Sequence, residues 1–116
     1  MTGNNDYIER MHRARAEKNW EALVEMGKSL LASQEYEPAI ECFTEARHLN
    51  KVEPLTHKHL GDAYLAMAEQ NSLDEVVKQK CLEKGRACYE DALQQAEARK
   101  DEHFLAEFSA EIIRKI

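Results

Sequence analysis

Three cysteines, Cys42, Cys81 and Cys88, are the side chains in this sequence best suited to redox or metal chemistry. Two of them, Cys81 and Cys88, would share one face of a helix because they lie seven residues apart. A metal site built on two thiolates needs two further ligands, and none lies on that stretch. The odd number of cysteines and the absence of CxxC spacing instead predict reduced, buried thiols in a cytoplasmic protein.

Histidines and paired carboxylates give no better catalytic or metal-binding pattern. His57 and His59 would face different sides of a helix, which is poor geometry for a shared metal ion. The acidic pairs Asp74-Glu75 and Asp101-Glu102 stand where helices are expected to begin, and there they complement the helix dipole. The sequence has no glycine-rich phosphate loop, GxSxG elbow or HExxH motif. It therefore predicts neither an enzyme nor a bound metal or cofactor.

The composition indicates a single folded, almost entirely helical domain. The chain has 116 residues, of which only 4 are glycine and 2 are proline, while 33% are charged. Its net charge of -6 argues against a nucleic-acid surface, which concentrates Lys and Arg on one face. No apolar run approaches the roughly 20 residues of a membrane span, and the polar N-terminus has no apolar signal core. We therefore expect a cytoplasmic protein with no nucleic-acid or membrane partner.

Residues 23–46 predict a helical hairpin. Apolar or small side chains at helical spacing form one face before a polar tip at Gln34-Glu35 and a second face after it. The first face contains Leu23, Met26, Gly27 and Leu30, and the second contains Ala39, Phe43 and Ala46. The first pattern returns 34 residues later, with Gly61 in the place of Gly27. A helix, turn and helix repeating at this period indicates tandem hairpins.

Caps and prolines divide the chain into about six helices. Side chains that accept a hydrogen bond from the first helical turn mark most of the starts, and proline fits the first turn. The expected helices run from Asn5 or Asp6 to about Glu17, from the cap Asn19 to about Ala32, through Pro38 to about Leu49, from Pro54 to about Gln70, from a Ser72 capping box onward, and from the cap Asp101 to the last residue.

The fifth helix is the least regular part of this pattern. No strong breaker precedes Lys100, so the helix can extend from Leu73 to Ala98, with Gly85 as its weakest point. Similarity between residues 41–46 and 87–92 pairs Tyr89 with Phe43. Folding back at residue 71 would nevertheless place Gly61 opposite about Leu82. Either the helix is continuous and overshoots the fourth helix, which we favour, or residues 73–79 form a separate short helix.

The stretch from Trp20 to Leu93 resembles tetratricopeptide repeats (TPRs). The first repeat carries Gly27, Leu30, Tyr36, Ala39, Ile40, Phe43, Ala46 and Leu49 at the family spacing, and the second carries His57, Leu60, Gly61 and Tyr64 before a stretched return helix. The resemblance implies an all-α fold of antiparallel hairpins stacked as a short right-handed solenoid. It divides the domain 1–116 into an N-terminal helix 1–18, a first repeat 20–50, a second repeat with an insertion 54–98 and a C-terminal helix 101–116.

The same resemblance implies a non-catalytic scaffold or adaptor that binds a peptide or protein segment in a concave groove. The groove is lined by the first helix of each repeat, and here those positions are Glu21, Val24, Lys28, Leu31, Lys58, Asp62 and Leu65. The alternative is that these are ordinary solvated helix positions. A clamp for a C-terminal carboxylate is not expected, because Val24 stands where such members of the family carry a lysine.

The last helix suggests a second hypothesis. Its apolar residues cover an arc of roughly 200°, whereas a terminal helix needs a stripe of only about 100°. The arc includes Phe104, Phe108, Ile112 and Ile116. We expect one side to contact helix five and the other to contact a further repeat, a bound partner or a second copy of the chain. The alternative function is therefore self-assembly into a homo-oligomer through the fifth and C-terminal helices.

Overall fold

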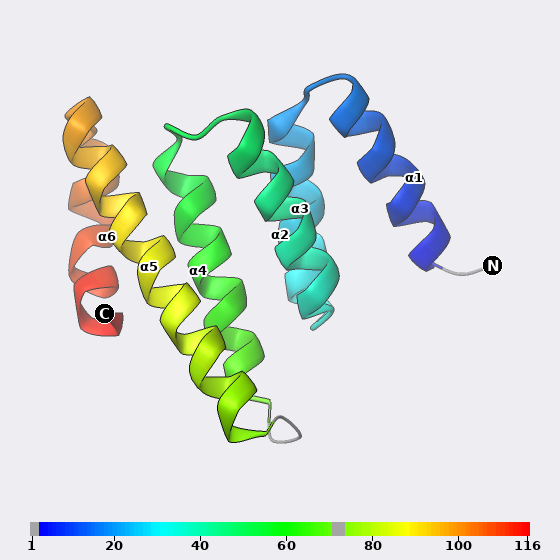
Figure 1. Ribbon diagram of the computed structural model, residues 1–116. Helices are drawn as coiled ribbons and strands as arrows, with labels where there is room; N and C mark the ends of the chain where they lie inside the picture. The colour runs from blue at the N-terminus through cyan, green and yellow to red at the C-terminus, as the bar shows by residue number, and fades with distance from the viewer. Residues whose placement is uncertain (1–2, 71–73) are drawn as a thin grey trace. The chain divides into compact units, whose positions relative to one another are not determined.

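The computed structural model describes residues 3–70 and 74–116, and side-chain positions from residue 6 onward, and all of its regular elements are helices. The all-α prediction is therefore confirmed for the described residues. The helices are α1 (Gly3–Ala16), α2 (Trp20–Ala32), α3 (Tyr36–Leu49), α4 (Pro54–Ala68), α5 (Glu75–Arg99) and α6 (Glu102–Lys115) (Figure 1). They form two compact units, Met1–Lys51 and Val52–Ile116, which we describe separately.

The first unit is built on the predicted hairpin of α2 and α3. Leu23 and Phe43 are both completely buried in its core. A Cβ atom added at Gly27 would lie only 2.5 Å from a ring carbon of Phe43, so the backbone of α2 rests directly on this ring. The first helix joins α3 through two polar contacts: the Tyr7 hydroxyl donates to Glu41 at 3.2 Å, and Arg15 Nε lies 3.1 Å from Glu45 Oε1.

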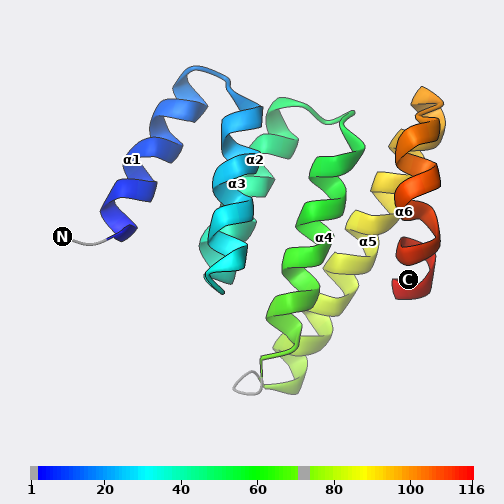
Figure 2. The same ribbon diagram turned by 180° about the vertical axis from the view of Figure 1, so that it is seen from behind.

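The second unit repeats this arrangement in the hairpin of α4 and α5 (Figure 2). A Cβ atom at Gly61 would lie 2.8 Å from a ring carbon of Tyr89 and 3.1 Å from the carbonyl oxygen of Gly85. A Cβ atom at Gly85 would in turn lie 3.1 Å from Leu65 Cδ2. Gly85 is thus more than a weak point in a long helix, because its missing side chain allows α5 to approach α4.

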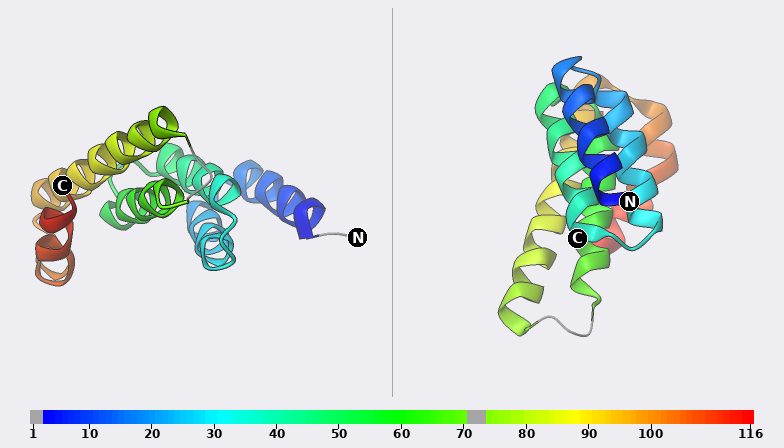
Figure 3. Two further views of the ribbon diagram at one scale, coloured as in Figure 1. Left: turned by 90° about the horizontal axis from the view of Figure 1, so that it is seen from below. Right: turned by 90° about the vertical axis from the view of Figure 1, so that its right-hand side faces the viewer.

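The fifth helix is continuous from Glu75 to Arg99, as favoured from the sequence. The matching of Tyr89 with Phe43 is confirmed as well, because Gly61 lies against Tyr89 and Gly85 and not opposite Leu82, where a simple reversal at residue 71 would place it. Figures 1 and 3 show the physical reason: α5 begins beyond the end of α4, and this overshoot moves later residues of α5 opposite Gly61. The paired aromatic positions, Phe43 and Tyr89, are therefore structurally equivalent within their hairpins.

Most of the predicted helix starts are confirmed, with two corrections. Asn19 Oδ1 accepts from Ala22 N at 3.1 Å, Asp101 Oδ1 accepts from Phe104 N at 3.1 Å, and Pro54 opens α4. The cap of α5 is Asp74, whose Oδ1 accepts from Val77 N at 3.0 Å, while the predicted cap Ser72 lies outside the described residues. The first helix begins at Gly3, so Asn5 and Asp6 lie inside it rather than capping it.

Three helices end on a non-glycine residue with left-handed backbone geometry. These residues are Lys18, Gln34 and Lys100, with φ values of 55°, 63° and 55°. In each case the backbone N–H of the following residue donates a hydrogen bond to a carbonyl oxygen in the last turn of the helix. Examples are Glu35 N to Leu30 O at 2.9 Å and Asp101 N to Ala96 O at 2.8 Å. This is the hydrogen-bond pattern of a Schellman motif, where glycine is the usual residue because it has no Cβ atom. Hydrogen bonding thus stops these helices without a glycine or proline.

We expect Gln34→Gly to stabilise the protein by roughly 0.5–1 kcal/mol, because glycine removes the steric penalty of the left-handed conformation at a position already in that geometry. Urea unfolding followed by circular dichroism measures the change. Ser33→Gly is the matched control, since Ser33 has φ of -87° and gains nothing from glycine. An unchanged or lower unfolding midpoint for Gln34→Gly would contradict the assignment.

Candidate partner-binding surface

The four predicted groove residues of the first unit lie on α2, but they differ in accessibility. Val24 is only 9% exposed and belongs to the core, so a ligand has little access to it. Glu21 is exposed, and Leu31 is half-buried. The Lys28 ammonium is also exposed and lies 3.5 Å from Glu25 Oε2. A ligand would therefore meet two opposite charges, Glu21 and Lys28, beside the apolar side chain of Leu31.

A cleft between α1 and α2 lies outside this predicted surface. Its lining combines two arginines, two glutamates and a small apolar floor, from Arg10, Arg13, Ala14, Glu17, Ala22, Glu25 and Met26. No local sequence pattern indicates this cleft, because its arginines belong to α1 and the rest of its lining comes partly from α2. The mixed charges give this cleft no clear preference for an anion or a cation.

The three predicted groove residues of the second unit are already engaged by their own chain. The carboxylate of Asp62 accepts a short hydrogen bond of 2.5 Å from the Tyr89 hydroxyl. Lys58 Nζ lies 2.9 Å from its other oxygen, Oδ2, and Lys115 Nζ lies 3.8 Å from Oδ1, the oxygen that accepts from Tyr89. Leu65 packs against Gly85 and the core beneath α6. We call Lys58, Asp62, Tyr89 and Lys115 the Asp62 network, which connects α4, α5 and α6.

Aromatic rings support the lysines of this network. Lys58 Nζ lies 4.8 Å from the ring centroid of Phe108, and Lys115 Nζ lies 5.7 Å from that of Tyr89. Both distances are within the range at which a cation is attracted to the face of an aromatic ring. Only 13% of the Lys58 side chain is exposed, so its contact with Asp62 is shielded from solvent. The network therefore positions α6 on α4 as well as on α5.

Titration behaviour follows from this environment. Burial raises the pKa of Tyr89 above its usual value, and the hydrogen bond to Asp62 and the charge of that carboxylate raise it further. The Tyr89 hydroxyl is accordingly protonated at neutral pH and acts as a donor to Asp62. Next to the network, a hydrogen bond from Lys115 lowers the pKa of Glu111, so that this carboxylate remains charged.

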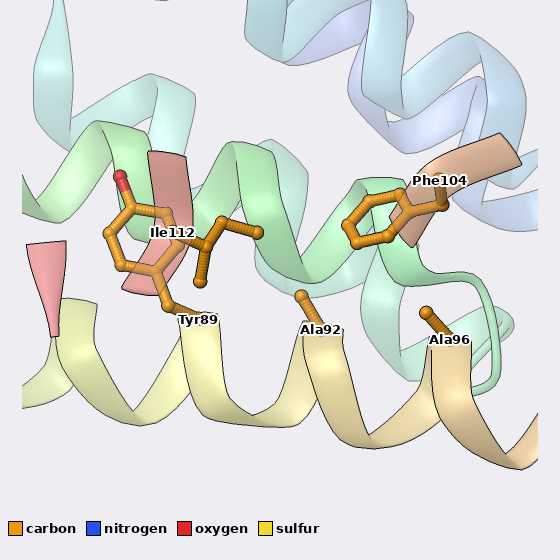
Figure 4. Close-up of a cluster of buried hydrophobic side chains, with 5 residues drawn as sticks. All are labelled: Tyr89, Ala92, Ala96, Phe104 and Ile112. Carbon is orange, nitrogen blue, oxygen red and sulfur yellow. The ribbon is translucent and has the colours of Figure 1, made fainter. Parts of the chain in front are cut away.

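The predicted assembly residues on α6 divide into two groups. Phe104 and Ile112 are buried against α5, where they form one hydrophobic cluster with Tyr89, Ala92 and Ala96 (Figure 4). They are therefore core residues of this unit. Phe108 is half-buried, with its ring centroid 5.1 Å from that of Phe104. The exposed apolar residues are Ile113, at 63%, and Ile116, at 42%. The contact with α5 therefore accounts for part of the wide apolar arc.

All three cysteines are buried thiols outside any disulfide, as the sequence predicted. Burial raises the pKa of Cys42 to about 11, which keeps its thiol protonated at neutral pH. Among residues 3–70 and 74–116, no cluster of three or more His, Cys, Asp or Glu side chains could hold a metal ion. None of the described helices is long and apolar enough to cross a membrane.

No protein-family model, curated protein or solved structure matches this chain. The interpretation of its surface therefore rests on the geometry of its own residues.

The network itself could only partly be found from the sequence. Lys58 and Asp62 are one helical turn apart, and this spacing suggests an ion pair. Nothing in the pattern joins Asp62 to Tyr89 or Lys115, because those contacts depend on how α5 and α6 fold back. The groove prediction therefore identified Lys58 and Asp62 without recognising that their own chain contacts them.

We expect Gly27→Ala and Gly61→Ala each to destabilise the protein by about 1–3 kcal/mol, because the added methyl group would overlap a buried ring. Chemical unfolding of each variant measures the loss. Gly85→Ala should cost less, since its nearest neighbour is the movable end of the Leu65 side chain. Equal stability of the wild type and Gly61→Ala would show that the ring does not pack as described.

Tyr89→Phe should destabilise the protein at pH 7 by about 1.5–3 kcal/mol, the usual value of a hydrogen bond to a charged group. The pKa of Tyr89 is raised on folding, so its contribution is fully present below the unfolded-state pKa of about 10 and is lost as pH rises above that value. The difference between the wild type and Tyr89→Phe should therefore shrink above about pH 10. Urea unfolding at pH 7, 9 and 10.5 tests this, and a pH-independent difference would contradict it.

Proposed function

We propose that this chain is a non-catalytic protein–protein interaction module of TPR-like architecture, acting as a scaffold or adaptor. The observation that carries the proposal is the equivalent packing of Gly27 on Phe43 and of Gly61 on Tyr89, each within a helical hairpin. The glycine of each pair lets the two helices pack closely, and the aromatic side chain fills the space next to the glycine. In the proposed architecture the hairpins stack as a right-handed solenoid, and α6 corresponds to the first helix of a third repeat.

In this proposal the partner is a peptide or protein segment that lies along the first helix of each hairpin. The accessible part of this surface is on α2, where Glu21 and Lys28 offer opposite charges and Leu31 offers an apolar contact. On α4, Lys58 and Asp62 form an ion pair with each other, and Asp62 also lies near Lys115 of α6. These two side chains therefore contribute less to partner binding than the groove prediction implied. The proposal therefore assigns the larger share of recognition to the first hairpin.

Charge reversal on α2 tests the groove hypothesis. Peptides selected from a random library against the wild-type chain provide the probe, and their affinities are compared by fluorescence anisotropy. We expect Lys28→Glu to change affinity by about 2–5-fold, the range for one exposed charge pair. Lys80→Glu is the control, because it makes the same charge change on an exposed position of α5.

Circular dichroism should show that both variants retain the helical fold. If Lys28→Glu and Lys80→Glu bind every selected peptide as the wild type does, recognition does not involve this face of α2. The groove assignment would then be wrong, whatever other surface the peptides use.

A second candidate function is self-assembly through α5 and α6. It is favoured by the exposure of Ile113 and Ile116 near the end of α6, at 63% and 42%. Light scattering over a wide concentration range decides whether the chain associates at all. A monomer at every concentration would exclude this function while leaving the groove hypothesis unaffected.

A further inference from the structure

The connection between α5 and α6 consists of only two residues, Lys100 and Asp101. Lys100 has left-handed geometry, with φ of 55° and ψ of 43°. Two hydrogen bonds close the end of α5, from Lys100 N to Glu97 O at 3.1 Å and from Asp101 N to Ala96 O at 2.8 Å. The chain reverses at this single residue, which therefore acts as the hinge between the two helices.

Most residues around the hinge favour an uninterrupted helix. Glu97, Ala98, Arg99 and Glu102 form helices readily, and neither glycine nor proline stands between α5 and α6. The local signal for a break is Asp101, which caps α6. Left-handed geometry costs an L-residue free energy relative to the right-handed helix. If Lys100 became helical, α5 and α6 would form one helix from 75 to 115, roughly 60 Å long at about 1.5 Å per residue. The hydrogen bonds at the hinge and the tertiary contacts of α6 together offset this cost and keep the hinge bent.

The contacts of α6 described above are with α4 and α5. Phe104 and Ile112 fill the core beside Tyr89, while Lys115 approaches Asp62 and Phe108 lies against Lys58. A second copy of the chain presents the same receiving surface. An α6 that swung away on a straightened hinge would find there every contact that it had left, so exchange would conserve the buried surface.

We propose that two copies of this chain exchange their α6 helices to form a dimer. In the exchanged form Lys100 is helical, and Lys115 of each chain approaches Asp62 of the partner subunit. Each receiving surface is incomplete without the other copy. This inference deepens the second candidate function by naming the exchanged element and hinge, and it is independent of the groove hypothesis.

The hinge at Gln34 is a less suitable point for exchange, although its φ of 63° is similar. Opening the chain there would separate α2 from α3, and α2 contributes five buried residues, Leu23, Val24, Met26, Gly27 and Leu30. Only two residues of α6 are buried, Phe104 and Ile112. Less apolar surface is exposed while α6 moves, so its exchange meets the smaller barrier.

Opposite changes at Lys100 provide the test. Lys100→Ala favours the helical hinge, whereas Lys100→Gly relieves the cost of the bent one. Each full-length chain is unfolded in urea, refolded at high concentration and analysed by size-exclusion chromatography with light scattering. Because two hinges change in every dimer, we expect the dimerisation constants of the two variants to differ by roughly tenfold or more, with the wild type between them. Circular dichroism checks that each variant refolds.

Two controls separate exchange from other association. Gln34→Ala and Gln34→Gly alter a similar hinge in the first unit and should leave the molar mass as in the wild type. Ile113→Glu, added to Lys100→Ala, changes an exposed position on α6 that the exchanged contact does not use. The dimer should survive this change, whereas a dimer formed through the exposed face of α6 would dissociate.

The proposal is overturned if Lys100→Ala and Lys100→Gly dimerise equally, or if Ile113→Glu abolishes the dimer. A dimer that strengthens equally with Gln34→Ala would also overturn it. If Lys100→Ala fails to refold, the comparison of Lys100→Gly with the wild type decides. Weaker dimerisation of Lys100→Gly then supports exchange, and equal or stronger dimerisation overturns it. Peptide binding by the same proteins reports on the groove hypothesis separately.

Discussion

Both hairpins depend on the close approach of a glycine backbone to an aromatic ring. In each, the first helix contributes the glycine and the second contributes the ring, at Gly27 with Phe43 and at Gly61 with Tyr89. A ring in this position fills the space that a side chain would otherwise occupy, and it also sets the distance between the helices. The second hairpin adds Gly85, so that backbone meets backbone where α4 and α5 approach each other.

Tyr89 links this packing to the polar contacts of the second unit. Its ring covers Gly61, its hydroxyl binds Asp62, and its other neighbours include Ile112 of α6. A single residue therefore contacts all three helices of the unit. Replacing Tyr89 would affect the α4–α5 approach and the docking of α6 together, whereas Phe43 has no hydroxyl with which to connect its hairpin to a third helix.

Features determined within one helix could be predicted from the sequence. The caps Asn19 and Asp101 and the start at Pro54 follow from the chemistry of helix ends, and the length of α5 follows from the lack of breakers. The similarity of residues 41–46 and 87–92 also paired Gly61 with Tyr89. The position of Gly85 beside Gly61 could not be predicted, because it depends on where α5 begins relative to α4. The left-handed Gln34 also lacked a signal, since glycine usually marks such positions. Contacts between distant helices, such as Lys115 with Asp62, have no local pattern at all.

The buried thiols have a practical consequence for following local motion. Cys42 lies on α3 of the first unit, and Cys81 and Cys88 lie seven residues apart on α5 of the second. A thiol reagent can modify such groups only when the surrounding structure opens, so the rate of modification reports the free energy of that opening. Variants that retain one cysteine each would thus measure local opening of α3 and of two points along α5 under native conditions. No new cysteine has to be introduced for this measurement.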